Sequence, residues 1–158
     1  MSTAQVVGIY IAPHHGEPTV WLEQAHLIPG MGIEGDRFFT PAPSNANSRP
    51  DHEITLIEIE AIEAVCNQDG IQISPDQTRR NIVTRGIRLN DLVGKVFSVG
   101  EVQLRGLRLC EPCDYLANRT DPRVKQSFSH RGGLRASILT EGYLHPSDTI
   151  HVSSLEQP

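Results

Sequence analysis

The stretch Val96-Phe-Ser-Val-Gly-Glu-Val-Gln-Leu104 decides the fold class of this chain. It predicts a strand over 96–99, a turn at Gly100-Glu101 and a second strand beginning near Val102, which together make a β-hairpin. The second strand continues through Leu104-Arg-Gly-Leu-Arg-Leu109, where leucines and arginines interleave as in a partly buried strand. The hairpin therefore leads directly into the segment that carries a pair of cysteines.

Short strands separated by turn signals recur outward from this hairpin in both directions. We expect further strands over 6–12, 24–28, 53–57, 82–83, 136–139 and 148–152, with helices over 58–67 and 113–118. A parallel α/β sheet would need helices that alternate with strands, and this pattern lacks them. We therefore predict a mainly β fold, a closed β-barrel with two or three short helices.

Length and composition place this barrel in one soluble domain. The chain has 158 residues, which suits a single domain over 1–158 with its core between about 6 and 152. The net charge of -5 favours neither nucleic acid nor an anionic membrane as a partner. No apolar run is long enough to cross a bilayer, and the N-terminus lacks a secretory signal, so we expect a cytoplasmic protein.

The cysteine pair lies in Leu109-Cys-Glu-Pro-Cys113. Pro112 suits the first turn of the short helix that we expect to follow. A thiol between a strand end and a helix N-terminus is favoured as the thiolate, which suits a metal ligand or a nucleophile. The remaining cysteine, Cys66, lies in a helical pattern and is interpreted as a small buried hydrophobe.

An arginine pair precedes the strand at 82–83, in the order Arg79-Arg80-Asn81. Successive strand residues point to opposite faces, so Arg79 and Asn81 are expected to share one face and Arg80 to take the other. Such pairs often only decorate a surface. Arginine beside a side-chain amide also makes a phosphate clamp, because both present forked donors.

Two glycine-rich turns are further candidates for ligand binding. Asp36 follows a loop with three glycines in six positions, which is either a tight turn or a loop that lines a site. His130-Arg131 precede Gly132 and a second glycine, an arrangement that lets a ligand lie against backbone amides. A structural role for His130 is the alternative. The Pro-, Ser- and Asn-rich stretch 40–50 is expected to be a surface loop over such a site.

Taken in order, these stretches resemble the MOSC family, named for the C-terminal domain of molybdenum cofactor sulfurases. The resemblance runs from about Val6 to Val152 and is carried by Gly32-Ile-Glu-Gly-Asp36, Arg79-Arg-Asn-Ile-Val83, Leu89-Asn-Asp-Leu-Val-Gly94, Leu109-Cys-Glu-Pro-Cys-Asp-Tyr-Leu116, His130-Arg-Gly-Gly-Leu134 and Asp148-Thr-Ile150. It implies a β-barrel that binds a molybdenum–pterin cofactor. By this resemblance Cys113 is the metal ligand and catalytic residue, and Arg79 and Asn81 help to hold the cofactor. We add Arg80, His130, Arg131, Gly132 and Asp36 as further candidates for cofactor binding, because they supply donors in the motifs described above.

The first functional hypothesis is a molybdenum-dependent reductase of N-hydroxylated compounds. The resemblance implies that the substrate is a small molecule whose oxygen leaves to the metal. We see no second domain for a flavin or an iron–sulfur centre, so we expect electrons to come from an external electron-transfer protein.

The second hypothesis is a sulfur carrier or cofactor-handling protein. Here Cys113 carries a persulfide supplied by a pyridoxal-phosphate desulfurase, and Cys110 is the resolving thiol. A CxxC dithiol oxidoreductase is a third interpretation, which the absence of a βαβ context around the motif disfavours. A zinc site is disfavoured further, because no second CxxC or histidine pair stands at ligand spacing.

Overall fold

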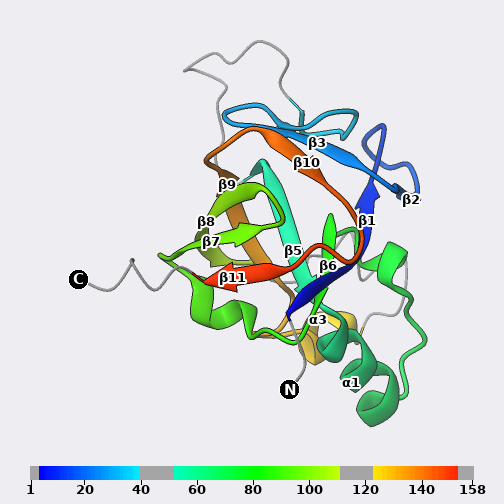
Figure 1. Ribbon diagram of the computed structural model, residues 1–158. Helices are drawn as coiled ribbons and strands as arrows, with labels where there is room; N and C mark the ends of the chain where they lie inside the picture. The colour runs from blue at the N-terminus through cyan, green and yellow to red at the C-terminus, as the bar shows by residue number, and fades with distance from the viewer. Residues whose placement is uncertain (1–3, 40–51, 111–122, 153–158) are drawn as a thin grey trace.

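The computed structural model describes residues 4–39, 52–110 and 123–152. Within these ranges the chain forms an eight-stranded sheet, a three-stranded sheet, two α-helices and two 3-10 helices (Figure 1). Cys113, the helix expected over 113–118 and the loop expected over 40–50 lie outside the described residues.

The larger sheet has the order β11-β7-β8-β9-β5-β6-β1-β2. Its strands are β1 (Gln5–Ile11), β2 (Val20–Trp21), β5 (Ile54–Glu58), β6 (Ile82–Arg85), β7 (Val96–Val99), β8 (Val102–Leu109), β9 (Leu134–Ile138) and β11 (Ile150–Val152). The smaller sheet has the order β10-β3-β4, from β3 (Ala25–Ile28), β4 (Gly32–Ile33) and β10 (Gly142–Leu144). All pairs are antiparallel except β5 with β6. The mainly β prediction is therefore confirmed.

The larger sheet is strongly curled, but the predicted closure into a barrel is wrong. Its two edges are β11 and β2, which have three and two residues. Near the gap, an isolated bridge joins Gln5 to Thr149, and Val6 donates its N–H to the carbonyl of Asp148 at 2.9 Å. A barrel needs a continuous ladder around the ring, and such short end strands cannot supply one. The fold is a curled half-barrel.

The hairpin that anchors the fold is confirmed, with Val99 paired to Val102 across the Gly100-Glu101 turn. The strand β8 then runs on to Leu109 and bends where the 3-10 helix η3 (Leu89–Leu92) crosses it. Gly106 permits that crossing, because a Cβ there would lie 2.1 Å from the carbonyl oxygen of Leu92. The side chains inside the curl, Phe97 and Leu104 among them, form the main core.

The longest helix lies in the connection between the two parallel strands of the larger sheet. The helix α1 (Ile59–Asp69) connects the parallel strands β5 and β6 and packs Ile62 and Val65 into a second core cluster. It ends at Gly70, whose φ of 67° is the left-handed conformation that glycine adopts without a Cβ penalty. The helix predicted over 58–67 is thus confirmed with slightly shifted ends.

The two α-helices lie at one end of the curled sheet and the β3–β10 pair lies at the other (Figure 1). The second α-helix, α3 (Val124–Ser127), lies beside α1, and the remaining 3-10 helix η2 (Pro75–Thr78) leads into β6. None of the helices in the described ranges is long and apolar enough to cross a membrane.

Candidate functional site

The end of β8 brings the first cysteine of the CxxC pair against the double glycine. Cys110 is fully buried, and its N–H donates to the carbonyl of Gly133 at 2.7 Å. Gly133 has a φ of +122°, and a Cβ there would lie 2.3 Å from the carbonyl oxygen of Leu56. The second glycine of the motif is therefore required for packing. Cys113 lies outside the described residues, and its roles as metal ligand and catalytic residue stay predictions.

Arg80 connects three stretches that the sequence marks separately. Its Nε donates to the carbonyl of Gly132 at 2.8 Å, and one terminal nitrogen donates to the carbonyl of Cys110 at 3.4 Å. The side chain is only partly exposed. The guanidinium is thus the group that joins the arginine pair, the double glycine and the start of the CxxC segment.

Arg79 is not a strand residue, and its side chain points elsewhere than the strand pattern predicts. It caps η2 in the left-handed conformation with a φ of 64°, and the strand begins only at Ile82. Its guanidinium donates to the carbonyl of Glu17 at 2.7 Å, in the loop between β1 and β2. The expectation that Arg79 and Asn81 share a strand face is wrong, because the alternation of a strand does not apply to a capping residue.

Asn81 is buried, and its amide group is used inside the protein. Its Oδ1 accepts from the backbone N–H and the hydroxyl of Thr55 at 3.0 and 3.1 Å, and its Nδ2 donates to the carbonyl of Tyr10 at 3.1 Å. These bonds tie β6 to both β5 and β1. They use the Oδ1 of Asn81 and one of the two N–H groups on its Nδ2.

Asp36 is also buried, and its carboxylate oxygens accept hydrogen bonds from other groups of the protein. Its Oδ1 accepts from the N–H of Ala12 at 3.0 Å and from Arg37 at 3.3 Å, while its Oδ2 accepts from the N–H of Phe38 at 3.3 Å. Asp36 therefore holds its own loop against the end of β1. It also orients the neighbouring arginine, Arg37.

That neighbour, Arg37, is a site residue that the sequence marked only as part of a loop. Its guanidinium donates to the carbonyl of Arg79 at 3.5 Å and lies over the ring of Phe38, 4.6 Å from the ring centre. Arg37 contacts Arg79, and Arg79 is followed in the chain by Arg80. We call these three residues the arginine row. Only its proximity to Asp36 signalled Arg37 in the sequence.

Phe38 lies next to Arg37 at one end of the arginine row and belongs to a small cluster of aromatic rings. The ring of His15 meets it edge-on at 5.3 Å between ring centres, and the ring of His52 lies at 4.9 Å. His15 is exposed to solvent. The arginine row therefore runs from an aromatic end at Phe38 to the backbone of Cys110 and Gly132.

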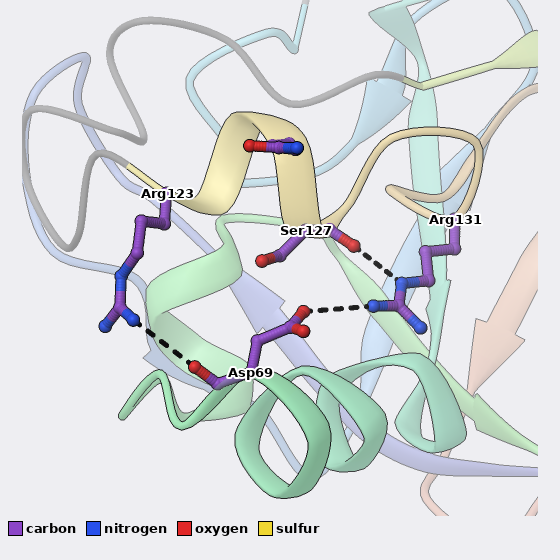
Figure 2. Close-up of a pocket in the computed structure, with 5 residues that line it drawn as sticks. Asp69, Arg123, Ser127 and Arg131 are labelled. Carbon is purple, nitrogen blue, oxygen red and sulfur yellow. Dashed lines mark hydrogen bonds and ion pairs between the residues drawn. The ribbon is translucent and has the colours of Figure 1, made fainter.

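The three residues of the turn His130–Gly132 contact different parts of the protein. His130 has a φ of 64°, and its carbonyl accepts from the side chain of Asn90 at 2.8 Å. Gly132 faces Arg80, as described above. Arg131 instead donates to the carbonyl of Ser127 at 2.6 Å and pairs with Asp69 at 3.3 Å, at a pocket between α1 and α3 (Figure 2). Gly132 therefore contacts Arg80 through its carbonyl, whereas the side chain of Arg131 points to a different site.

Two carboxyl groups with a shifted pKa lie in structural positions away from the arginine row. Burial raises the pKa of Glu53, whose Oε1 accepts from the N–H groups of Ile138 and Gly30 at 3.0 and 3.3 Å. Burial likewise raises the pKa of Glu58, which accepts from the N–H of Leu89 at 3.0 Å. In the described ranges, no three His, Cys, Asp or Glu side chains are grouped so as to hold a metal ion.

Comparison with known proteins gives both a family and a fold. The model of the MOSC domain family matches residues 13–151 of this chain. The crystal structure of the YuaD protein from Bacillus subtilis superposes with a TM-score of 0.77 and 20% identity, covering 96% of each chain. Comparison with curated proteins finds no match.

Two YiiM structures share the fold as well. YiiM from Geobacillus stearothermophilus has a TM-score of 0.71 at 15% identity, covering 96% of this chain and 75% of the other. YiiM from Escherichia coli has a TM-score of 0.71 at 18% identity, covering 98% of this chain and 71% of the other. At such identities the likeness concerns the fold alone.

Proposed function

The chain belongs to the MOSC domain family, and from this premise we propose that it binds the molybdenum cofactor and serves as the reductase component for N-hydroxylated compounds. The observation that carries the proposal is the pair of hydrogen bonds that Arg80 donates to the carbonyls of Gly132 and Cys110. It gathers a cation, a glycine turn and the start of the CxxC segment at one place. Those are the elements that a thiolate-ligated, phosphate-bearing cofactor requires.

The donor chemistry of the arginine row fits this cofactor. A pterin phosphate is bound best by several forked donors, and guanidinium groups supply them. Arg37, Arg79 and Arg80 are each partly exposed, and a phosphate bound there would share their guanidinium groups with the partners that they already have. Asp36 fits a supporting role, because its carboxylate would repel a phosphate and already accepts from Ala12 and Arg37. Asn81 could offer only the second N–H of its Nδ2, since its other groups bind Thr55 and Tyr10.

Each residue in the proposal has a distinct task. When bound, the cofactor supplies two-electron chemistry at molybdenum, and an external electron-transfer protein supplies the electrons. The arginine row holds the phosphate, and Arg80 holds the start of the CxxC segment by its bond to Cys110. Cys113, which follows three residues later, is proposed as the metal ligand because soft thiolates suit molybdenum.

The burial of Cys110 bears on the competing hypotheses. A resolving thiol or a dithiol pair needs both sulfurs to be reachable by a reagent. Cys110 has no exposed surface, which fits a packing role better than either of those. The sulfur-carrier hypothesis is therefore retained only as an outcome of the experiment that follows.

Molybdenum and pterin analysis of the protein made in a cofactor-competent host tests the proposal. We expect near-stoichiometric molybdenum in the native protein and in Cys110→Ala, and its loss in Cys113→Ala. Arg80→Gln should lower the content, whereas Arg88→Gln, at an exposed arginine paired with Asp91, should not. A metal-free native protein that accepts a persulfide on Cys113 would instead support the sulfur carrier.

Activity distinguishes the reductase from a protein that only stores or delivers cofactor. The loaded protein, supplied with a chemically reduced viologen dye, should reduce an amidoxime to the amidine. Loaded protein that fails to consume the dye with any N-hydroxylated substrate would show that cofactor binding is correct and that the reductase assignment is wrong.

A further inference from the structure

The pocket between the end of α1 and α3 has features of a second ligand site. It has a volume of about 430 Å³ and is lined by Asp69, Arg123, Gln126, Ser127 and Arg131. Figure 2 shows the two arginines on opposite sides, each reaching toward Asp69 from above, with Ser127 between them. We propose that this pocket binds the phosphate group of a small molecule through Arg123 and Arg131.

The lining favours an anion. Its ionised side chains are two guanidinium groups and one carboxylate, and Ser127 and Gln126 add a hydroxyl and an amide. Arg131 is anchored through Nε to the carbonyl of Ser127 at 2.6 Å, which holds its guanidinium at the pocket wall. A guanidinium held in this way loses less conformational entropy when an anion binds.

The arrangement suits a phosphate better than a carboxylate. A carboxylate is planar and is satisfied by a single forked guanidinium. The oxygens of a phosphate point in several directions and can accept from donors on opposite walls, as Arg123 and Arg131 are. The pocket volume also exceeds that of a phosphate alone, so it has room for the organic part of a phosphomonoester.

Asp69 is the competitor that an anion must displace. Its carboxylate pairs with Arg131 at 3.3 Å, and its backbone carbonyl accepts from Arg123 at 3.3 Å. Both charged side chains of the pair are about one-third exposed, at 34% and 36%, so solvent and ligand can reach the ion pair. A carboxylate at the C-terminal end of a helix opposes the helix dipole, so its presence is not explained by stabilisation of α1.

This site is separate from the arginine row. The turn that carries both sends the carbonyl of Gly132 to Arg80 but the side chain of Arg131 to Asp69. The inference therefore goes beyond the proposed function and does not depend on cofactor binding.

Calorimetric titration of the full chain with inorganic phosphate, against chloride at matched ionic strength, tests the proposal. We expect saturable binding that Arg123→Gln and Arg131→Gln each weaken by about tenfold or more. Asp69→Asn should tighten binding, since it removes the competing charge. Arg88→Gln should leave the affinity unchanged, as a matched loss of one exposed arginine.

The remaining variants separate this site from the arginine row. Phosphate bound at the pocket should be weakened by Arg123→Gln and Arg131→Gln, whereas phosphate bound at the arginine row should be weakened by Arg80→Gln. If Arg80→Gln abolishes binding while Arg131→Gln does not, phosphate binds at the row and the pocket proposal is overturned. Glycerol 3-phosphate in a second titration distinguishes the sources: tighter binding than inorganic phosphate indicates a phosphorylated metabolite, and weaker binding indicates the free ion.

The effect of Asp69→Asn on phosphate affinity distinguishes a binding role of the two arginines from a purely structural one. If Arg131 and Arg123 serve only to hold α1 and α3 together, this variant loses thermal stability and gains no phosphate affinity. Absence of saturable binding in both the native chain and Asp69→Asn would likewise overturn the proposal.

Discussion

The Nε of Arg80 lies 2.8 Å from the carbonyl oxygen of Gly132, although 52 residues separate the two in the chain. The same guanidinium reaches the carbonyl of Cys110, so one side chain joins the segment before β6, the residue after β8 and the turn before β9. This contact places the arginine pair beside the CxxC segment. It underlies the proposed function and the first prediction.

Arg80→Lys should destabilise the protein by about 1–2 kcal/mol, because an ammonium cannot replace the two directed bonds of the fork. The free energy of unfolding in urea measures this loss. Arg88→Lys is the matched control at an exposed i,i+3 ion pair and should change stability by less than about 0.5 kcal/mol. Equal effects at the two positions would contradict a clamp at Arg80.

Gly133→Ala should be severely destabilising, by about 3 kcal/mol or more. The added Cβ would lie 2.3 Å from the carbonyl oxygen of Leu56 in a backbone with a φ of +122°, so the strand pair β5–β9 must move. Gly94→Ala is the control, since its φ is +80° but nothing lies within 4 Å of the new Cβ. A loss of only about 1 kcal/mol is expected there, from the positive φ alone. Thermal unfolding of both variants distinguishes the clash from the strain.

Asn81→Ala should cost about 2–4 kcal/mol of stability, because the backbone N–H of Thr55 and the carbonyl of Tyr10 lose buried partners. Asn90→Ala removes an exposed amide bond to the carbonyl of His130 and should cost less than about 1 kcal/mol. Urea denaturation of the cofactor-free chain gives both values. A stable Asn81→Ala protein that merely fails to load molybdenum would show that Asn81 contacts the cofactor instead.

Glu53 should make the stability of the protein fall as the pH rises above the acid range. Burial raises its pKa above the ordinary value of 4.5, so between that value and the raised pKa the native state binds more protons than the unfolded chain. The stabilising contribution is complete below 4.5 and is lost as the pH passes the raised pKa. Glu53→Gln keeps the Oε1 acceptor for Ile138 and Gly30 but not the charge.

Unfolding free energies measured across this pH window test the sign. The difference between Glu53→Gln and the native chain should move in favour of the variant as the pH rises. Glu58 also has a pKa raised by burial and remains in both proteins, so part of the native pH dependence should persist in the variant. An unchanged difference across the window would show that Glu53 does not titrate between the two states.

The sequence by itself determined the local elements. The hairpin at 96–104, the helix that ends at Gly70 and most strand positions are confirmed, because alternation, helical spacing and turn glycines act over a few residues. The family was also determined at this level, since the MOSC resemblance depends on the order of short motifs.

Only the tertiary structure decided which side chains meet. Periodicity placed Arg79 and Asn81 together, but a left-handed cap turns Arg79 toward Glu17, and long-range bonds to Thr55 and Tyr10 take up Asn81. The failure of the sheet to close is likewise a property of its end strands, whose lengths are set by partners far along the chain. Contacts between distant segments depend on backbone direction and packing in three dimensions, which the spacing of residue types along the chain does not record.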